Sequence, residues 1–481
     1  MIMNKIRNTF LPLIVGLITL LSGCDNYLDV NVDPTLKPDA TVQELLPTAQ
    51  FYSSEASYQQ AYFACQYAQQ ISSNLGTNGT DTYAESENPT GWSNLYLYVI
   101  PQLNTIIRKG QAEDISGYVG IAKTLLAYNI GIATVNWENV PFSKADQEPK
   151  NFQPAYDTQQ EIYTTIQRLL DEAIVELAKN SGTKPGTDDL IYSGDLTKWT
   201  KLAYSLKARY LLHLSNKNPK QTAETVLAAV QKGMTSNADD FQMPYNTKNL
   251  SPWYSRVALA NSTGNLSVTY GSTFVDLMNG KVQTVVDTRL TKVVTLKTGQ
   301  TAYNGVFPGS NLGSTVDFTI RSWHSSITSP ILMMTYSEVK AIEAEARFLA
   351  NDGTFSSKGT TEAAYAAYLA IARSNMSKLG VTDADIVAYL AAAAVNVGAD
   401  QLTLLSILRE KYKAMFLIGD IWTDLRKYDY WDFPLPQNIN PDLQGRRIQR
   451  MKYPSSELTR NTANAEANQK TPATPMWFSS K

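Results

Sequence analysis

The chain has 481 residues and a formal net charge of −2. Such a balanced charge gives no electrostatic attraction to nucleic acid or anionic lipid, which excludes binding driven by either polyanion. Two histidines are too few for a histidine-based metal site, while 27 tyrosines and 8 tryptophans make the chain rich in aromatic rings. Because rings both fill cores and contact ligands, their positions have to separate the two uses.

The first 23 residues are predicted to form a lipoprotein signal peptide. A positively charged head precedes an apolar run from Phe10 to Leu21, which is shorter than the roughly 20 residues of a membrane span. The letters LSGC that end at Cys24 resemble the bacterial lipobox, in which the cysteine is diacylated and the chain is cut just before it. We therefore expect a lipid-anchored mature chain, 24–481, that forms one domain. The alternative is an ordinary cleaved signal with an incidental cysteine.

Helical periodicity dominates the first part of the mature chain. Apolar or aromatic residues recur every three or four positions in three blocks, at 41–73, 92–107 and 116–135. Cys65 lies in the first block and has no disulfide partner once the other cysteine carries lipid, so we expect it to be a buried thiol. The turn-forming stretch 139–142 ends the third block.

The later helices are predicted to occur in pairs. Their signals are capping residues at the start, an apolar stripe along one face, and glycine after the end. The predicted pairs are 157–177 with 195–210, 329–349 with 365–379, and 405–415 with 422–425. Ser329-Pro330 is the expected start of one of these helices, with proline at the first helical position. Stacked pairs of this kind predict a mainly α fold of tetratricopeptide-like repeats with few short strands, although the strict repeat signature is absent.

Two stretches interrupt the helical pattern. A loop-rich insert at about 233–329 is rich in Asn, Ser, Thr, Gly and Pro, with short strands expected near 292–296. The stretch 75–91 is also polar and contains glycine. Loops on a rigid helical frame are where binding residues concentrate, so we expect the ligand site in these two stretches.

The candidate ligand-binding residues are the large rings of these loops and their polar neighbours, which we expect to form a shallow platform. They are Tyr83, Trp92, Trp253, Tyr254, Tyr270 and Trp323, with Asn78, Asn261 and His324 beside them. For each ring the alternative is burial beneath a long loop. Trp92 is the weakest candidate, because it begins a helix and its spacing to Tyr96 suits a core stripe.

Catalytic motifs are absent from the sequence. It contains no His-Glu-x-x-His, no Gly-x-x-x-x-Gly-Lys and no Gly-x-Ser-x-Gly. The sequence does not exclude a catalytic pair of carboxylates like that of glycosidases. The adjacent pair 239–240 and the pair Glu343 and Glu345 are interpreted as structural or solvated. His213 lies on a helical apolar stripe and is expected to be a hydrogen-bonded core residue. The prediction is a protein that is not an enzyme and that uses no cofactor or metal.

The mature chain contains several distinctive short motifs. They are Tyr27 to Pro34 after the lipobox, Trp92-x-x-x-Tyr96 with Pro101-x-x-Asn104, N-V-P-F-S-K-A at 139–145, D-T-R-L at 287–290, and the C-terminal cluster at 409–426 and 453–461. Together they resemble the SusD/RagB family, in particular its SusD-like branch. The stretch at 139–145 has Asn and Phe where the family has Asp and Tyr, and 287–290 lacks the family's proline.

The resemblance implies an α-helical surface lipoprotein of the Bacteroidota outer membrane with four tetratricopeptide-like units. It implies capture of nutrient oligomers for a SusC-like TonB-dependent barrel, without catalysis. Most such proteins bind glycans and some bind peptides, so glycan capture is the expectation, with peptide capture and an extracellular glycoside hydrolase as alternatives. The motif residues themselves are expected to hold the frame: Arg409, Trp422, Arg426 and Tyr453.

Overall fold

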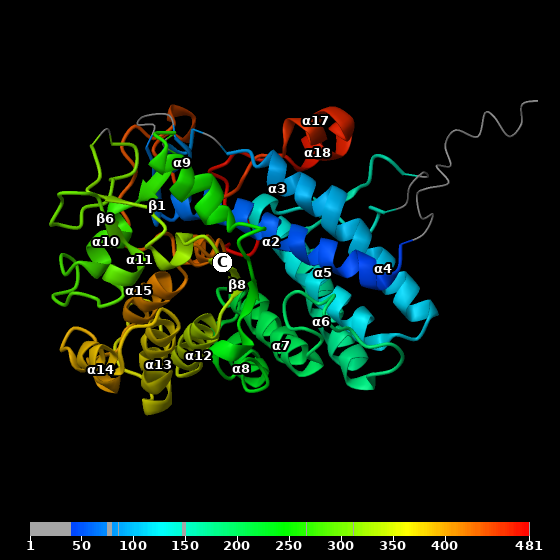
Figure 1. Cartoon of the computed structure of the whole chain (residues 1–481), viewed down its shortest axis with the longest axis horizontal. Helices are drawn as coiled ribbons and strands as arrows, with labels where there is room; N and C mark the ends of the chain where they lie inside the picture. Colours follow the sequence, from blue (N-terminus) through cyan, green and yellow to red (C-terminus); the bar gives the residue numbers. More distant parts are fainter. Residues whose placement is uncertain are drawn as a thin grey trace, which may run out of the picture. The chain divides into compact units, whose positions relative to one another are not determined.

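The compact unit Val42–Lys481 is built mainly of helices (Figure 1). The computed structural model describes residues 40–74, 79–84, 86–146, 151–265, 267–310 and 312–480. The predicted signal peptide 1–23, the lipidation residue Cys24 and the candidate Asn78 lie outside these residues. The predicted mainly α class is confirmed: the strands in the described residues are two to four residues long.

The three early helical blocks are confirmed. The elements are α2 (Val42–Tyr67), α3 (Pro89–Ser93), the π-helix η3 (Asn94–Val99), α4 (Ile100–Ala112) and α5 (Ser116–Trp137). α2 ends earlier than predicted, because Gln69 takes a left-handed φ of 57° and the chain continues as strand β1 (Ile71–Ser73). α5 is long and apolar enough to cross a membrane by composition, but all of its residues are buried in the unit, so it acts as the central core helix.

The repeat helices follow two of the three predicted pairings. They are α6 (Gln159–Lys179), α7 (Leu196–His213), α8 (Pro219–Val230), α12 (Tyr336–Ala350), α13 (Glu362–Lys378), α14 (Asp383–Ala391), α15 (Leu404–Ala414) and α16 (Ile421–Lys427). Each of α5, α6 and α7 packs on the next helix, and α12 packs on both α8 and α13, which confirms the first two predicted pairs. The third predicted pair is not formed in this way, because α15 packs mainly on α12 and α13 rather than on α16. The caps that begin α6 and α7, Thr158 and Asp195, lie at the starts of the predicted helices 157–177 and 195–210. Helices α8 and α14 were not predicted.

The helix expected at Ser329-Pro330 begins later, and that prediction is wrong. Residues Ile331–Met334 form strand β8, which pairs with β4 (Phe241–Met243), and α12 starts at Tyr336 with Thr335 as its cap. The hydroxyl of Ser329 donates to the carbonyl of Trp323 at 2.6 Å and caps no helix. Four consecutive apolar residues with both sides buried suit a strand better than a helix with one exposed face.

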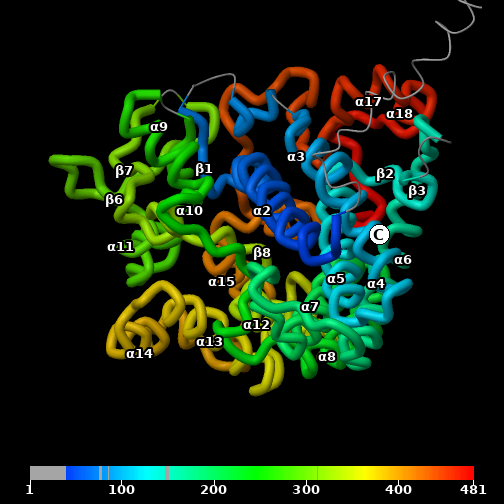
Figure 2. Tube along the Cα trace, turned by 45° about the vertical axis from the view of Figure 1, so that its right-hand side comes forward, coloured from blue at the N-terminus to red at the C-terminus, as the bar shows by residue number. Residues whose placement is uncertain are grey.

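The insert contains short elements held by long-range pairing. They are the π-helix η5 (Tyr254–Ala258), α9 (Leu259–Ser262), β5 (Val268–Tyr270), α10 (Ser272–Met278), α11 (Leu290–Val293), β6 (Thr295–Leu296), β7 (Val316–Asp317) and the 3₁₀ turn η6 (Trp323–Ser325). β1 pairs antiparallel with β5, with Ile71 opposite Tyr270. This pairing brings the two loop-rich stretches of the sequence together, as Figure 2 shows for β1 and the green segments beside it.

Two further groups complete the frame. β2 (Val140–Pro141) pairs with β3 (Tyr156–Asp157), and α17 (Ser455–Arg460) continues into α18 (Thr462–Asn468) near the C-terminus. The remaining 3₁₀ turns of the described residues are η2 (Thr80–Thr82), η4 (Asn237–Asp239, within the insert), η7 (Ala399–Gln401) and η8 (Pro441–Leu443).

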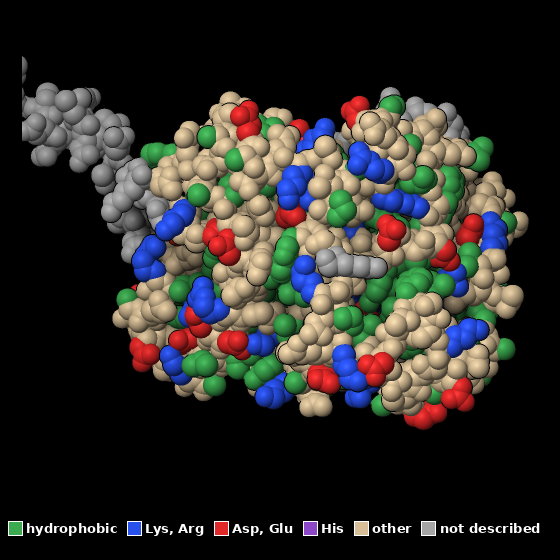
Figure 3. Space-filling model, turned by 180° about the vertical axis from the view of Figure 1, so that it is seen from behind, with side chains coloured by type: hydrophobic (Ala, Val, Ile, Leu, Met, Phe, Trp, Pro, Cys, Tyr) green, Lys and Arg blue, Asp and Glu red, His purple; other side chains and the backbone are tan. Residues whose placement is uncertain are grey.

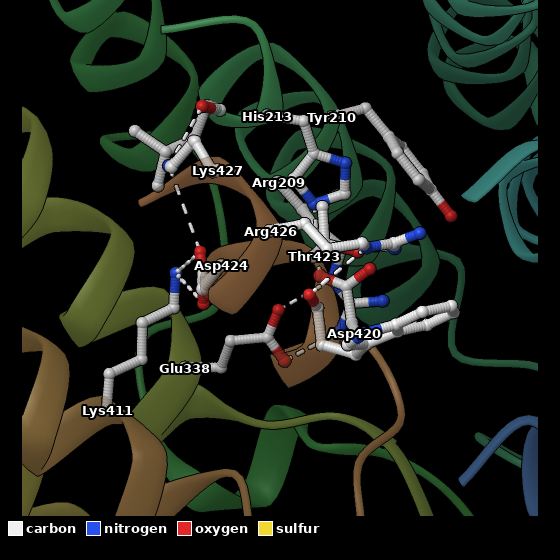
Figure 4. A network of polar contacts seen from close by, with 12 residues as sticks. Arg209, Tyr210, His213, Glu338, Lys411, Asp420, Thr423, Asp424, Arg426 and Lys427 are labelled. Atoms are coloured by element: carbon white, nitrogen blue, oxygen red, sulfur yellow. Dashed lines mark hydrogen bonds and ion pairs between the residues drawn. The ribbon is translucent and has the colours of Figure 1, made fainter. Parts of the chain in front are cut away.

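Buried charges join helices that are far apart in sequence (Figure 4). Arg209 on α7 donates to both carboxylate oxygens of Glu338 on α12 at 2.6 Å. His213 lies 3.0 Å from Asp420 through Nε2 and 2.9 Å from the hydroxyl of Tyr163 through Nδ1, which confirms it as a core histidine. Because Arg209 faces the carboxylates of both Glu338 and Asp420, these charges can stay buried among the repeats.

Three of the four C-terminal motif residues make the contacts expected of frame residues. The guanidinium of Arg426 lies 3.7 Å from the centroid of the Trp422 ring and donates to the carbonyl of Val135 at 2.6 Å. The hydroxyl of Tyr453 donates to the carbonyl of Asn139 at 2.7 Å. These contacts connect the end of the chain to the end of α5 and the turn that follows it.

Candidate functional site

The structure buries three of the rings expected to contact ligand. Tyr83, Trp253 and Tyr270 are each at most 3 % exposed. The ring of Tyr270 stacks on Phe318 at a centroid distance of 4.2 Å, and its hydroxyl donates to the carbonyl of Val293 at 2.6 Å. Large rings bury much apolar area per side chain, so the insert uses them to build its own core. The structure therefore does not support a ligand platform on these three rings.

The polar candidates of the insert serve its internal structure. Asn261 donates to the carbonyl of Val268 at 2.9 Å and to a carboxylate oxygen of Asp317 at 2.7 Å, so it closes the turn before β5. His324 is buried with its ring centroid 5.1 Å from that of Phe416. Burial, helped by the charge of Lys378, lowers the pKa of His324 to about 3. Neither residue is free to bind a ligand in this arrangement.

Tyr254 and Trp323 are half-buried and keep part of each ring exposed. The ammonium group of Lys378 lies 5.4 Å from the centroid of the Trp323 ring, which occupies one ring face. Tyr254 begins the π-helix η5. Neither residue lines either of the two hollows described next.

A hollow of about 430 Å³ lies where α3, η3, the β2–β3 connection and α17 meet; we call it the α3–α17 hollow. Figures 1 and 2 both show α17 and α18 beside α3. Its apolar lining includes Trp92, Tyr96, Leu97 and Phe152, and its polar lining includes Asp146, Asn151, Glu457, Arg460 and Asn461. Its lining combines aromatic rings with amides and charged groups.

The aromatic side of the hollow is built on the start of a helix. Asn88 caps α3 by accepting the backbone N–H of Gly91 at 2.9 Å, which positions Trp92. The ring of Trp92 lies 4.4 Å from that of Tyr96, and both are largely covered. Leu97 is 63 % exposed and Phe152, from the β2–β3 connection, is 69 % exposed. Trp92 and Tyr96 therefore form the floor, while Leu97 and Phe152 offer most of the apolar contact area.

The polar side of the hollow is ordered by hydrogen bonds. One carboxylate oxygen of Glu457 accepts from the hydroxyl of Tyr156 at 2.8 Å and from the side-chain amide of Asn461 at 2.9 Å. Asp146 accepts from the side-chain amide of Asn104 at 3.0 Å. Burial and the neighbouring Glu457 raise the pKa of Tyr156, so this phenol stays protonated and donating. These bonds hold the two carboxylates in place and leave lone pairs for hydroxyl groups of a ligand.

Arg460 supplies the basic group of the hollow. Its side chain is exposed at the C-terminal end of α17, and among the described residues its guanidinium has no carboxylate partner. A guanidinium presents several N–H donors in a fixed plane. The hollow therefore contains acceptors, donors and apolar surfaces within one site.

The sequence did not lead to a prediction of this site, although several of its residues lie in motifs described above. Of the predicted ligand residues that the structure describes, Trp92 alone lines the hollow. Apart from the segment 92–97, the lining comes from 141–154 and 456–461, and part of it belongs to the motifs 139–145 and 453–461, which were interpreted as frame elements only. The available signal was that each of the three motifs, at 92–104, 139–145 and 453–461, carries Asn or Glu near an apolar residue.

A second hollow of about 220 Å³ lies between α10 and the segment 431–434 after α16. Its rim contains the motif residue Arg409, which pairs with Asp432. Three consecutive residues that precede or enter it, Asp429, Tyr430 and Trp431, have positive φ. This hollow is smaller and its one arginine is already paired, so we regard the α3–α17 hollow as the candidate site.

The carboxylate pairs considered for catalysis are occupied by cations. Asp239 lies 3.0 Å from Lys201, and Asp240 lies 2.7 Å from Lys378. Glu343 binds Lys340 and Arg347 on its own helix. Glu345 binds Lys427 at 2.5 Å inside the core. These contacts agree with the structural interpretation of both pairs.

Comparisons with known proteins agree with the architecture. The sequence model of the SusD-like family, described as "Starch-binding associating with outer membrane", matches residues 36–454. No curated protein matches the chain significantly. Among solved structures, a SusD homolog from Bacteroides uniformis has a TM-score of 0.73 at 22% identity and covers 92% of this chain and 100% of its own.

Two other solved structures are similar. A SusD/RagB family protein from Bacteroides thetaiotaomicron has a TM-score of 0.72 at 23% identity and covers 92% of this chain and 99% of its own. A chitin-binding SusD homolog from Flavobacterium johnsoniae has a TM-score of 0.73 at 19% identity and covers 90% and 97%. The family match extends over most of the chain and the helical architecture is shared with these structures. The chain therefore belongs to the SusD/RagB family, as a SusD-like, outer-membrane-associated nutrient-binding protein.

Proposed function

We propose that the protein captures oligosaccharides in the α3–α17 hollow and delivers them to a TonB-dependent outer-membrane barrel. The observation that carries this proposal is the lining of the hollow, where exposed Leu97 and Phe152 lie beside oriented carboxylates and Arg460. Sugar rings pack their C–H faces on apolar and aromatic side chains, while their hydroxyls exchange hydrogen bonds with amides and carboxylates. We infer further that the mature chain starts at Cys24 and is anchored by lipid at the cell surface.

The composition of the site favours a glycan over a peptide. A peptide site would offer an exposed strand edge with side-chain pockets. The strands next to the hollow, β2 and β3, are two residues long and pair with each other. On the face shown in Figure 3, basic and acidic side chains are interspersed, so this face presents no patch of a single sign of charge. Because solved relatives are named for chitin binding, oligomers of N-acetylglucosamine are the first glycans to test, followed by maltooligosaccharides.

The test is replacement of the most exposed ring of the hollow. Phe152→Ala should weaken glycan binding roughly fivefold, the equivalent of about 1 kcal/mol for one ring contact, measured by isothermal titration. The melting temperature should barely change, because this ring is 69 % exposed. Phe355→Ala, at a ring 43 % exposed on the far repeats, is the matched control and should keep full affinity.

Other outcomes would contradict parts of the proposal. Unchanged affinity in both Phe152→Ala and Arg460→Ala would place the glycan elsewhere on the protein. Binding of peptides but of no glycan would favour the peptide-capture alternative. Because Asp146 and Glu457 both line the hollow, the same samples are analysed for cleaved sugar. We expect none, and product that disappears in Glu457→Gln would identify a hydrolase.

A further inference from the structure

The α3–α17 hollow continues into an exposed aromatic surface on its helical side. We call this surface the Leu97–Tyr98 ledge; it consists of Phe51 and Tyr52 on α2 and Leu97 and Tyr98 on η3. Leu97 lines the hollow, and Tyr98 is the next residue along the chain. The ring of Tyr98 stacks on that of Tyr52 with a centroid distance of 4.4 Å and an interplanar angle of 14°. Phe51 packs edge-on against Tyr52 at 5.3 Å.

The ledge is unusually open for a group of large apolar side chains. Leu97 is 63 %, Tyr98 41 % and Phe51 36 % exposed, whereas the part of α2 that follows is almost entirely buried. Leu97 and Tyr98 both lie on the π-helical turn η3, whose wider ladder shifts the side-chain register within one continuous helix. Contiguous exposed apolar side chains usually mark a binding surface.

The ledge has the features of a sugar-binding surface. None of its four side chains is charged. In the part of the chain that the structure describes, the hydroxyls of Tyr52 and Tyr98 have no hydrogen-bond partner, so both are available to a ligand. Stacked rings with free hydroxyls provide both contacts that a sugar unit uses. A strip only a few side chains wide suits a single extended chain better than a protein surface, which usually needs 20 to 30 residues on each side.

We propose that the Leu97–Tyr98 ledge binds the continuation of a linear, uncharged oligosaccharide whose end lies in the α3–α17 hollow. This inference rests on the proposed function and extends it, because it makes chain length a determinant of affinity. Short oligomers contact the hollow alone. Longer ones cross Leu97 and contact Tyr98 and Tyr52, so the protein selects extended chains over small sugars.

The experiment is a titration with N-acetylglucosamine oligomers and maltooligosaccharides of increasing length, from the disaccharide upward. The affinity of the unmodified protein should rise with length beyond the size that fills the hollow. Tyr98→Ala should remove that rise, with a loss of roughly fivefold for the longest oligomers and no change for the shortest. Tyr98→Phe keeps the ring and should keep most of the rise. Phe152→Ala should weaken short and long oligomers alike.

The variants separate failure of this inference from failure of the proposed function. If Phe152→Ala weakens binding but Tyr98→Ala does not, the hollow binds glycan and the ledge does not. If neither change alters affinity for any oligomer, or no oligomer binds, the proposed site fails and the inference fails with it. If Tyr98→Ala keeps the full length dependence but loses copurification with an outer-membrane barrel, the ledge is a protein interface and the inference is overturned. Melting temperatures check that each variant is folded.

Discussion

His324 shows how a single side chain acquires an unusual chemistry from burial. It lies on the 3₁₀ turn η6, next to Trp323 and against Phe416, and its Nδ1 has no hydrogen-bond partner among the described residues. Removing imidazolium from water is unfavourable, and the nearby charge of Lys378 adds to this, so the pKa of His324 falls to about 3. The residue is therefore neutral in the folded protein at any ordinary pH.

This depressed pKa predicts a pH-dependent contribution to stability. Below pH 6.5 the unfolded chain binds a proton at His324 that the folded protein does not bind until about pH 3. The free energy of unfolding should therefore fall as the pH drops below 6.5, by up to about 1.4 kcal/mol per pH unit from this residue. His324→Phe removes the titration. Urea unfolding at several values between pH 7 and pH 4.5 should give a shallower slope for the variant.

The comparison is between slopes, because many carboxylates also titrate in this range. Equal slopes for the two proteins would mean that His324 gains a proton while folded, contrary to its burial.

At the scale of elements, helix α6 shows how local chemistry positions a repeat. The hydroxyl of Thr158 accepts the backbone N–H of Glu161, and the carboxylate of Glu161 accepts the backbone N–H of Thr158 at 2.8 Å. Two N–H groups that the helix leaves unpaired are thus satisfied. Hydrogen bonding to Thr158 lowers the pKa of Glu161. Asp157, the last residue of β3, directly precedes this cap, and its carboxylate accepts the backbone N–H of Ser143 at 2.7 Å.

Loss of this cap should have a measurable cost. Thr158→Ala should lower the free energy of unfolding by about 1 kcal/mol, because an N–H group loses its acceptor. Thr164→Ala is the matched control: this exposed hydroxyl bonds within the same helix to the carbonyl of Gln160. The control should be neutral or slightly stabilising, since alanine has the higher helix propensity. Denaturant unfolding compares the two, and equal losses would show that the cap contributes nothing of its own.

At the scale of the whole molecule, buried ion pairs join the central and C-terminal helices. Glu345 on α12 is 0 % exposed and binds Lys427 on α16 at 2.5 Å and Lys411 on α15 at 3.3 Å. The hydroxyl of Tyr428 donates to the same carboxylate at 2.7 Å. Burial alone would raise the pKa of Glu345, but the two lysines lower it to about 2. Glu343, two residues earlier, binds Lys340 and Arg347 nearer the surface.

These two glutamates predict very different mutational costs. Glu345→Gln should lower the free energy of unfolding by about 3–5 kcal/mol, because Lys427 loses its closest carboxylate inside the core. Glu343→Gln, on the same helix, should cost less than about 1 kcal/mol, because its partners are solvated. Thermal and denaturant unfolding measure both. A small effect of Glu345→Gln would mean that Asp424, 3.8 Å from Lys427, replaces the lost partner.

The sequence by itself determined the helical class, most helix positions and the family, because capping and periodicity are local properties. Thr158 and Asp195 cap their helices through local hydrogen bonds that do not depend on how the helices pack. Trp422, Arg426 and Tyr453 form part of the frame. At Ser329-Pro330 the local sequence predicted the start of a helix, and this prediction was wrong. The residues that follow form strand β8 because they pair with the distant strand β4.

Only the tertiary structure decided which rings are open to a ligand. Tyr270 and Phe152 are both aromatic residues outside long helices, yet Tyr270 is covered by Phe318 and Phe416 while Phe152 is exposed. The α3–α17 hollow likewise needs segments from both ends of the chain to meet, as Tyr156 and Glu457 do. The exposure of a side chain depends on every residue that packs against it, and those neighbours are distant in sequence. A local sequence pattern therefore cannot predict which rings are exposed.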